Sequence, residues 1–297
     1  MGEAGRPEAA GVTVREALRW ASSFFRGQVE RPQRAAEMLL CGAGGWRREE
    51  LFAEPEMPLT REQWAVFQEW VRRHRDGEPL QYILGEVSFY DMTFTVNRHV
   101  LIPRPETELL VEETLREVKA GWNAERPLRM ADIGTGSGVI AITLARLHPR
   151  WEVWAVDCSA AALAVARENA RRLGMEGQIH WLEGDFCQPL KEQGVWVDLL
   201  ISNPPYVARS DLAALPAGVR DYEPRLALDG GEDGLDAYRR IIRDLPSVLL
   251  PGALVAFEVG IHQADEVCRM LKTAGFADCK ARADLAGIPR FVFARWV

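Results

Sequence analysis

The stretch that decides the fold is residues 130–138, which read Met130-Ala131-Asp132-Ile133-Gly134-Thr135-Gly136-Ser137-Gly138. Its start is typical of a buried strand, and three glycines at alternate positions follow. The apolar residues 139–145 then open a helix. Glycine lets the backbone come close to a ligand, and the helix N-terminus lies directly behind the turn. The stretch therefore predicts a strand, a ligand-binding turn and a helix of an α/β fold.

The spacing of the glycines narrows the choice of ligand. A dinucleotide fingerprint needs a glycine at position 139 after those at 134 and 136, and position 139 is valine. A nicotinamide or flavin site would therefore lack its third glycine. Alternating glycines preceded by an acid fit S-adenosylmethionine better. We expect this cofactor to contact Gly134, Thr135, Gly136, Ser137 and Gly138.

Two later strands end in residues suited to the rest of that ligand. Residues 152–156 lead to Asp157, whose carboxylate is placed to accept hydrogen bonds from both ribose hydroxyls. The alternative is an N-terminal cap, since Ser159 and an alanine-rich helix follow. Residues 179–182 lead to Asp185 and Phe186, which are suited to an adenine edge and face, although Phe186 is equally suited to the core. Together with the glycine turn, these residues favour the ligand-binding interpretation.

A fourth strand is followed by a turn that suits a planar amine. The apolar residues 197–201 lead to Asn203-Pro204-Pro205-Tyr206. Two prolines end the strand and leave carbonyl oxygens beside the Asn203 amide. A substrate NH₂ group can then donate to the Asn203 side-chain oxygen and the Pro204 carbonyl while Tyr206 packs on its face. The alternative is an ordinary proline-rich turn. All four sites follow the carboxyl ends of strands, where open α/β sheets bind ligands.

In this order, these motifs resemble those of the class I S-adenosylmethionine-dependent methyltransferases. Three further segments resemble the release factor N5-glutamine methyltransferases within that class: residues 79–85 (Pro-Leu-Gln-Tyr-Ile-Leu-Gly), 101–108 (Leu-Ile-Pro-Arg-Pro-Glu-Thr-Glu) and 223–228 (Glu-Pro-Arg-Leu-Ala-Leu). One departure is Phe186, where some relatives have tryptophan. The resemblance spans most of the chain.

The resemblance implies a substrate and a set of site residues. The substrate is the glutamine of a Gly-Gly-Gln loop in class I peptide release factors, and the products are the methylated glutamine and S-adenosylhomocysteine. Asn203 and Pro204 would hold the carboxamide, with Pro205 and Tyr206 beside it; Asn203, Pro204 and Tyr206 are the catalytic candidates. The implied cofactor site comprises Gly134, Thr135, Gly136, Ser137, Gly138, Asp157, Asp185, Phe186 and Asn203.

Three other functions remain open at this stage. A related enzyme modifies a ribosomal-protein glutamine, and DNA adenine or RNA guanine methyltransferases use similar tetrapeptides. A nucleic-acid enzyme needs base extrusion or a single strand, and a basic groove. The third alternative is a binding module without turnover, against which the intact glycines, Asp157 and Asn203 argue.

Composition sets bounds on these choices. At 297 residues and 47% apolar, the chain is long enough for two cores. Its net charge of −7 argues against a protein that coats nucleic acid. The five cysteines show no spacing typical of zinc or disulfides, so we expect no metal. The sequence has neither a signal-peptide pattern nor a stretch of ~20 apolar residues, which predicts a soluble cytoplasmic protein that does not enter a membrane.

Three domains are expected along the chain. Residues 1–84 carry apolar side chains at helical spacing and predict a helical substrate-recognition domain, with residues 1–10 disordered. Residues 85–104 alternate with period two and predict a β-hairpin linker. Residues 105–297 alternate strands and helices, which predicts a Rossmann-like, mainly parallel sheet. Expected helices include 106–119, 139–147, 159–173, 235–249 and 263–274, and expected strands 129–133, 152–156, 178–182, 196–201 and 253–259.

Two further segments complete these expectations. The tail, 279–283 and 290–296, predicts a closing hairpin with an antiparallel last strand. Residues 206–234 are long for a connection and predict a functional loop over the site. Glu106 and Glu108 either favour the helix N-terminus electrostatically or take a cofactor-side role, as the family signature suggests.

Overall fold

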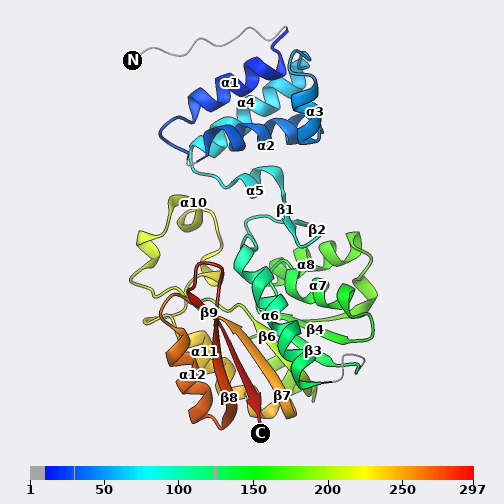
Figure 1. Ribbon diagram of the computed structural model, residues 1–297, viewed down its shortest axis with the longest axis vertical. Helices are drawn as coiled ribbons and strands as arrows, with labels where there is room; N and C mark the ends of the chain where they lie inside the picture. The colour runs from blue at the N-terminus through cyan, green and yellow to red at the C-terminus, as the bar shows by residue number, and fades with distance from the viewer. Residues whose placement is uncertain (1–10, 30, 123–125) are drawn as a thin grey trace. The chain divides into compact units, whose positions relative to one another are not determined.

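The computed structural model describes residues 11–29, 31–122 and 126–297. The chain folds into two compact units (Figure 1). One comprises the described residues up to Gly85 together with Ala217–Tyr222, and the other comprises Glu86–Pro216 and Glu223–Val297. The disorder predicted for residues 1–10 lies outside the described residues. No helix among the described residues is long and apolar enough to cross a membrane.

The first unit is helical, as its apolar spacing predicts. Its elements are α1 (Val14–Phe24), α2 (Pro32–Gly44), α3 (Arg48–Ala53), α4 (Arg61–Arg75), α5 (Leu80–Leu84) and α10 (Ala217–Arg220). Thr13 and Thr60 begin α1 and α4 with capping boxes that satisfy the first backbone donors. Phe25, Leu39 and Phe67 are fully buried between the helices and form the centre of this core.

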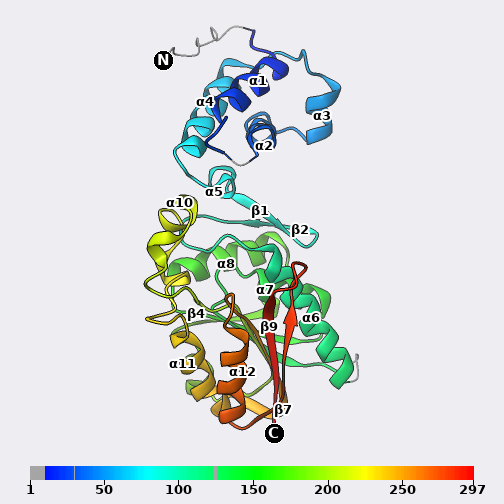
Figure 2. The same ribbon diagram turned by 60° about the vertical axis from the view of Figure 1, so that its left-hand side comes forward.

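The second unit begins with the expected hairpin. β1 (Glu86–Phe89) pairs with β2 (Met92–Thr95) around Tyr90 and Asp91. The buried Asn169 of α8 (Ala160–Arg172) holds this hairpin, because its side-chain oxygen accepts from the Thr95 amide at 2.7 Å and its nitrogen donates to the Thr95 carbonyl at 3.0 Å. Figure 2 shows the hairpin beside α8. That residues 1–84 recognise the substrate stays a prediction.

A seven-stranded sheet forms the centre of the second unit. Its strands are β3 (Arg129–Ile133), β4 (Glu152–Asp157), β5 (Ile179–Glu183), β6 (Val197–Ser202), β7 (Leu249–Glu258), β8 (Phe276–Ala283) and β9 (Pro289–Trp296). They lie in the order β5-β4-β3-β6-β7-β9-β8, and β9 runs antiparallel to both of its neighbours. The predicted mainly parallel sheet with an antiparallel last strand is therefore confirmed.

Helices cover both faces of this sheet (Figures 1 and 2). One face carries α6 (Pro105–Gly121), α7 (Val139–Leu147) and α8, and the other carries α9 (Gln188–Glu192), α11 (Asp236–Asp244) and α12 (Ala264–Thr273). Successive strand residues point to opposite faces. Met130 therefore packs in the core under α6, α7 and α8, and Ala131 and Ile133 pack in the core under α9, α11 and α12. Short 3₁₀ turns occupy Glu176–Gln178, Leu212–Ala214, Arg225–Ala227 and Leu245–Ser247.

The prediction of one helix over 235–249 is wrong. α11 ends at Asp244, a 3₁₀ turn follows at Leu245–Ser247, and β7 already begins at Leu249. Pro246 has no backbone N–H to continue the α-helical ladder. β7 was expected only from 253 because Pro251 and Gly252 interrupt its apolar pattern; the strand accommodates them where its register with β6 shifts between Val197 and Leu199.

Candidate active site

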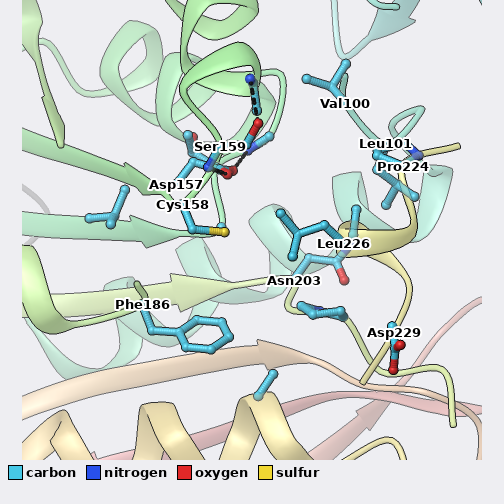
Figure 3. Close-up of a pocket in the computed structure, with 18 of the residues that line it drawn as sticks. Val100, Leu101, Asp157, Cys158, Ser159, Phe186, Asn203, Pro224, Leu226 and Asp229 are labelled. Atoms are coloured by element: carbon cyan, nitrogen blue, oxygen red, sulfur yellow. Dashed lines mark hydrogen bonds between the residues drawn. The ribbon is translucent and has the colours of Figure 1, made fainter. Parts of the chain in front are cut away.

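A cavity of about 600 Å³ lies in the second unit where the predicted motifs meet. It is lined by the segments that follow the carboxyl ends of β3, β4, β5 and β6, including Gly134–Ser137, Asp157, Asp185, Phe186, Asn203 and Pro205. Figure 3 shows Asp157, Phe186 and Asn203 around this opening. The glycine turn and Asn203 follow the neighbouring strands β3 and β6, between which the strand order reverses, the usual ligand site of such sheets. The volume is that of a small-molecule site.

The glycine turn adopts a conformation that requires its glycines. Gly134, Gly136 and Gly138 have φ values of 74°, 56° and 83°, in the left-handed region that side chains disfavour. The amides of Gly134 and Thr135 both donate to the Val156 carbonyl at 2.9 Å, which fixes the turn against β4. A Cβ atom at Gly134 or Gly136 would meet no atom within 4 Å. The backbone of the turn is therefore open to a ligand.

Asp132 holds the turn from behind. Its side chain is fully buried, and its Oδ2 accepts from the Thr135 hydroxyl at 2.6 Å and from the Ala141 amide at 3.2 Å. Burial raises the pKa of Asp132 to about 7. Asp132 thus connects the turn to the first residues of α7 without itself lining the cavity.

Asp157 connects the glycine turn to the next loop. Its Oδ2 accepts from the Gly136 amide at 2.8 Å and its Oδ1 accepts from the Ser159 amide at 2.9 Å. The N-cap of α8 is Ser159, whose side chain accepts from the Ala162 amide, so the capping alternative does not require Asp157. Burial raises the pKa of Asp157. A carboxylate has further lone pairs, so Asp157 can still accept from ligand hydroxyls at the cavity wall.

Asp185 and Phe186, which are predicted to contact adenine, have a neighbour that the sequence did not indicate. Arg240 of α11 pairs with the Asp185 carboxylate, and its guanidinium lies 4.9 Å from the centre of the Phe186 ring. Phe186 has a left-handed φ of 45°, and the residue lines the cavity. The charge of Asp185 is therefore balanced by Arg240, a residue that the sequence analysis missed.

The Asn203 tetrapeptide divides between the cavity and the core. Asn203 and Pro205 line the cavity, whereas Pro204 is buried and Tyr206 packs its ring against the core on the α11 side. Burial raises the pKa of Tyr206 to about 12, so its hydroxyl stays protonated. The Gln263 side chain donates to the Tyr206 carbonyl at 3.0 Å. The roles assigned to Pro204 and Tyr206 stay predictions.

The long connection after Tyr206 contributes to the cavity wall. Pro224, Arg225, Leu226 and Ala227 line the cavity, and Leu226 is 61% exposed. This segment is anchored by Glu223, whose buried carboxylate accepts from Arg104 at 2.7 Å. Leu101 and Pro224 both line the cavity (Figure 3). Two segments of the family signature, 101–108 and 223–228, therefore meet at the cavity.

Besides Arg240, sequence reasoning missed three residues that line the cavity or contact its lining, directly or through Thr107. Thr107 lines the cavity and contacts Asn203, Glu258 contacts Thr107, and Asn169 donates to the Ser137 carbonyl at 2.9 Å. Glu258 ends β7, so the rule that sites follow strand ends contained a signal for it. Thr107 and Asn169 lie within helices and carried no comparable signal.

The fold and the glycine turn define a class I methyltransferase. In agreement, a profile of the methyltransferase small domain matches residues 107–220, and a profile of the PrmC N-terminal domain matches residues 16–85. A solved 16S rRNA methyltransferase from T. thermophilus, in complex with AdoMet and guanosine, shares this fold with a TM-score of 0.51 and 16% identity, over 71% of this chain and 50% of that one. The methyl donor of the class is S-adenosylmethionine, as predicted.

Close relatives identify the family within that class. The release factor glutamine methyltransferase of Bacillus cereus is 42% identical over 284 residues, which cover 95% of this chain and 99% of that protein. The release factor glutamine methyltransferase of Bacillus subtilis is 38% identical over 283 residues, 95% and 97% of the two chains. The chain belongs to the family of release factor glutamine methyltransferases, which confirms the resemblance drawn from the sequence.

Proposed function

We propose that the protein transfers a methyl group from S-adenosylmethionine to the side-chain amide nitrogen of the glutamine in the Gly-Gly-Gln loop of class I peptide release factors. The observation that carries the proposal is the position of Asn203, whose carboxamide lies at the wall of the same cavity as the glycine turn and Asp157. The relatives named above support the acceptor. Such a substrate also implies a cytoplasmic site of action.

The cavity suits the cofactor on three grounds. Its turn has open space at Gly134 and Gly136, a carboxylate lies at Asp157 and an aromatic ring lies at Phe186. When bound, S-adenosylmethionine supplies an electrophilic methyl group on a sulfonium. Asp157 would accept from the ribose hydroxyls, Asp185 and Phe186 would border the adenine, and Thr135, Ser137 and Gly138 would complete the turn.

Asn203 and Pro204 would prepare the acceptor. An amide nitrogen is a weak nucleophile because its lone pair is delocalised into the carbonyl. The Asn203 side-chain oxygen and the Pro204 carbonyl would accept the two amide hydrogens and fix the nitrogen in line with the methyl group, while Pro205 and Tyr206 limit movement of the carboxamide. Alignment of this kind is worth several kcal/mol, about 7–11 at best. Transfer would form a carbon–nitrogen bond as the carbon–sulfur bond of the donor breaks, with S-adenosylhomocysteine as the other product, and the amide nitrogen would release one proton to water.

The test is transfer of tritiated methyl from S-adenosylmethionine to a purified class I release factor. We expect one labelled residue, the loop glutamine, and no label on DNA or RNA oligonucleotides rich in adenine and guanine. Replacing the loop glutamine by asparagine should lower labelling on the order of 100-fold, because the shorter side chain withdraws the nitrogen from the methyl donor.

A variant of this protein provides the control. Asn203→Ala should abolish transfer and leave the calorimetric affinity for S-adenosylmethionine nearly unchanged. Label on oligonucleotides or on a ribosomal protein, with none on the release factor, would overturn the proposal. A large loss of cofactor affinity in Asn203→Ala would instead move Asn203 from the acceptor to the cofactor.

A further inference from the structure

A line of polar side chains leads from the cavity wall into the protein interior. The Asn203 side-chain nitrogen donates to the Thr107 hydroxyl at 3.2 Å, and this hydroxyl donates to Glu258 Oε2 at 2.8 Å. Thr107 is 3% exposed and Glu258 is 2% exposed. The three residues come from the end of β6, the first turn of α6 and the end of β7. Residues far apart in the sequence therefore form one hydrogen-bonded relay.

The direction of the relay determines which atom Asn203 presents to the cavity. A hydroxyl has one hydrogen to donate, and Thr107 directs it to Glu258. The Thr107 oxygen can then only accept from Asn203, so the NH₂ group of Asn203 turns to Thr107. The Asn203 oxygen is left to face the cavity. Thr107, which lies behind Asn203, thus determines that Asn203 offers its oxygen as the acceptor for a substrate amide.

The direction of these hydrogen bonds depends on whether the Glu258 carboxyl carries a proton. Burial raises the pKa of Glu258 to about 7. Tyr238 of α11 donates to the Glu258 backbone carbonyl at 2.8 Å and holds the end of β7 in place. The charged and titratable groups that act on the carboxyl from the neighbouring elements are Arg104, Glu106, Tyr206, Tyr238 and Arg290.

We propose that Thr107 and Glu258 are positioning residues that orient the Asn203 amide so that its oxygen faces the substrate nitrogen. The proposal rests on the proposed function, because it assigns a cause to the acceptor that this function requires. An ionised Glu258 can only accept, and it therefore holds the Thr107 hydrogen. A protonated Glu258 can donate to Thr107, whose hydrogen then turns to Asn203 and favours the flipped amide. A flipped amide presents NH₂ to the substrate NH₂ and cannot bind it.

The test compares Thr107→Val, which keeps the shape and removes the hydroxyl, with Thr107→Ser, which restores the hydroxyl. Thr114→Val is the matched control, because Thr114 is a fully buried threonine of the same helix whose hydroxyl donates to the Leu110 carbonyl. We expect Thr107→Val to lower kcat/KM for the release factor about 10- to 100-fold and to leave the calorimetric affinity for S-adenosylmethionine within about twofold. Thr107→Ser should recover most of the rate, and Thr114→Val should keep the wild-type rate.

A pH profile separates orientation from packing. The wild-type kcat/KM should fall as the pH drops through about 7, and Glu258→Gln, which cannot titrate, should lose this limb. This second variant keeps the proposal testable if Thr107→Val does not fold. Equal rates for Thr107→Val and Thr114→Val, no rescue by serine, or an unchanged pH limb in Glu258→Gln would each overturn the relay. If the wild type itself does not label the release factor, the proposed function fails instead.

Discussion

Gly136→Ala should mainly weaken cofactor binding, and Gly138→Ala should mainly lower the free energy of unfolding, although the two glycines lie in one turn. Both have left-handed φ values, 56° and 83°. At Gly138 a Cβ atom would lie 2.9 Å from Ile142 Cδ1 and 3.1 Å from Ala166 Cβ, whereas at Gly136 it would meet no atom within 4 Å. We therefore expect Gly138 to serve mainly the packing of α7 on α8, and Gly136 to serve mainly the cofactor.

The magnitudes follow from these contacts. A left-handed alanine costs about 1–2 kcal/mol, and the stiffer unfolded chain offsets about 0.4–1 kcal/mol of this at either position. Only Gly138→Ala adds overpacking, so its free energy of unfolding should be lower than that of Gly136→Ala by about 1–3 kcal/mol. For cofactor affinity, we expect Gly136→Ala to be the more damaging of the two substitutions. A methyl group at Gly136 that crowds the ligand by a similar 1–3 kcal/mol weakens binding roughly 5- to 150-fold.

Urea unfolding followed by circular dichroism measures the first quantity, and calorimetric titration with S-adenosylmethionine measures the second. Gly138→Ala should bind the cofactor within a few-fold of the wild type. Native cofactor affinity in Gly136→Ala would show that the ligand does not approach this residue. Equal stability of the two variants would show that Ile142 moves aside without cost, and the packing argument would then be wrong.

The remaining predictions concern Asp157, Asp132 and Cys158. Asp157→Ala should weaken S-adenosylmethionine binding by roughly 1.5–3 kcal/mol for each hydrogen bond lost; unchanged calorimetric affinity would leave Asp157 only its contacts with backbone amides. Burial raises the pKa of Asp132 from 3.8 to about 7, so the folded protein keeps a proton that the unfolded chain has released, and this stabilising contribution is complete below about pH 4 and lost as the pH rises through about 7. Asp132→Asn should thus gain stability relative to the wild type as the pH rises from about 4 to about 7, by up to about 1.4 kcal/mol per pH unit in that window; a constant difference in urea midpoints would contradict the raised pKa. Cys158 is accessible, lines the cavity and directs its sulfur into it (Figure 3), so maleimide should block cofactor binding and S-adenosylmethionine should protect this thiol. Partial desolvation and then the charge of Asp157 raise the pKa of Cys158, so the labelling, followed by peptide mass spectrometry, belongs near pH 8.5. Cofactor binding unaffected by complete labelling of Cys158 would place the ligand elsewhere.

The sequence predicted most of the sheet because its signals are local. A buried strand such as β3 has an apolar run, and the glycines that follow it are needed wherever the backbone turns left-handed. The rule that ligands bind at strand ends then brought Gly134, Asp157, Phe186 and Asn203 to one edge, and the structure places all four at one cavity.

What the sequence did not reveal depends on contacts between distant residues. Asn203 and Thr107 are 96 residues apart, and Thr107 and Glu258 are 151 residues apart. Thr107 is an ordinary helix residue in local terms, and only the packing of α6 on β7 gives its hydroxyl a buried carboxylate. Arg240 was missed for the same reason, since its contact with Asp185 depends on how α11 packs on the sheet.

The segment from Arg104 to Glu108 shows why such contacts cannot be replaced by local rules. Pro105 begins α6, and the acids of the first turn suit a helix N-terminus, so local reasoning finds a complete explanation there. Yet Arg104 holds Glu223, Thr107 joins Asn203 to Glu258, and Glu108 accepts from the Tyr90 amide of the hairpin at 2.8 Å. A helix start would tolerate many sequences, whereas simultaneous contacts with Glu223, Asn203, Glu258 and Tyr90 require these side chains at this spacing. The physical content of the signature is therefore that one helical turn contacts Asn203, the cavity wall and the hairpin together.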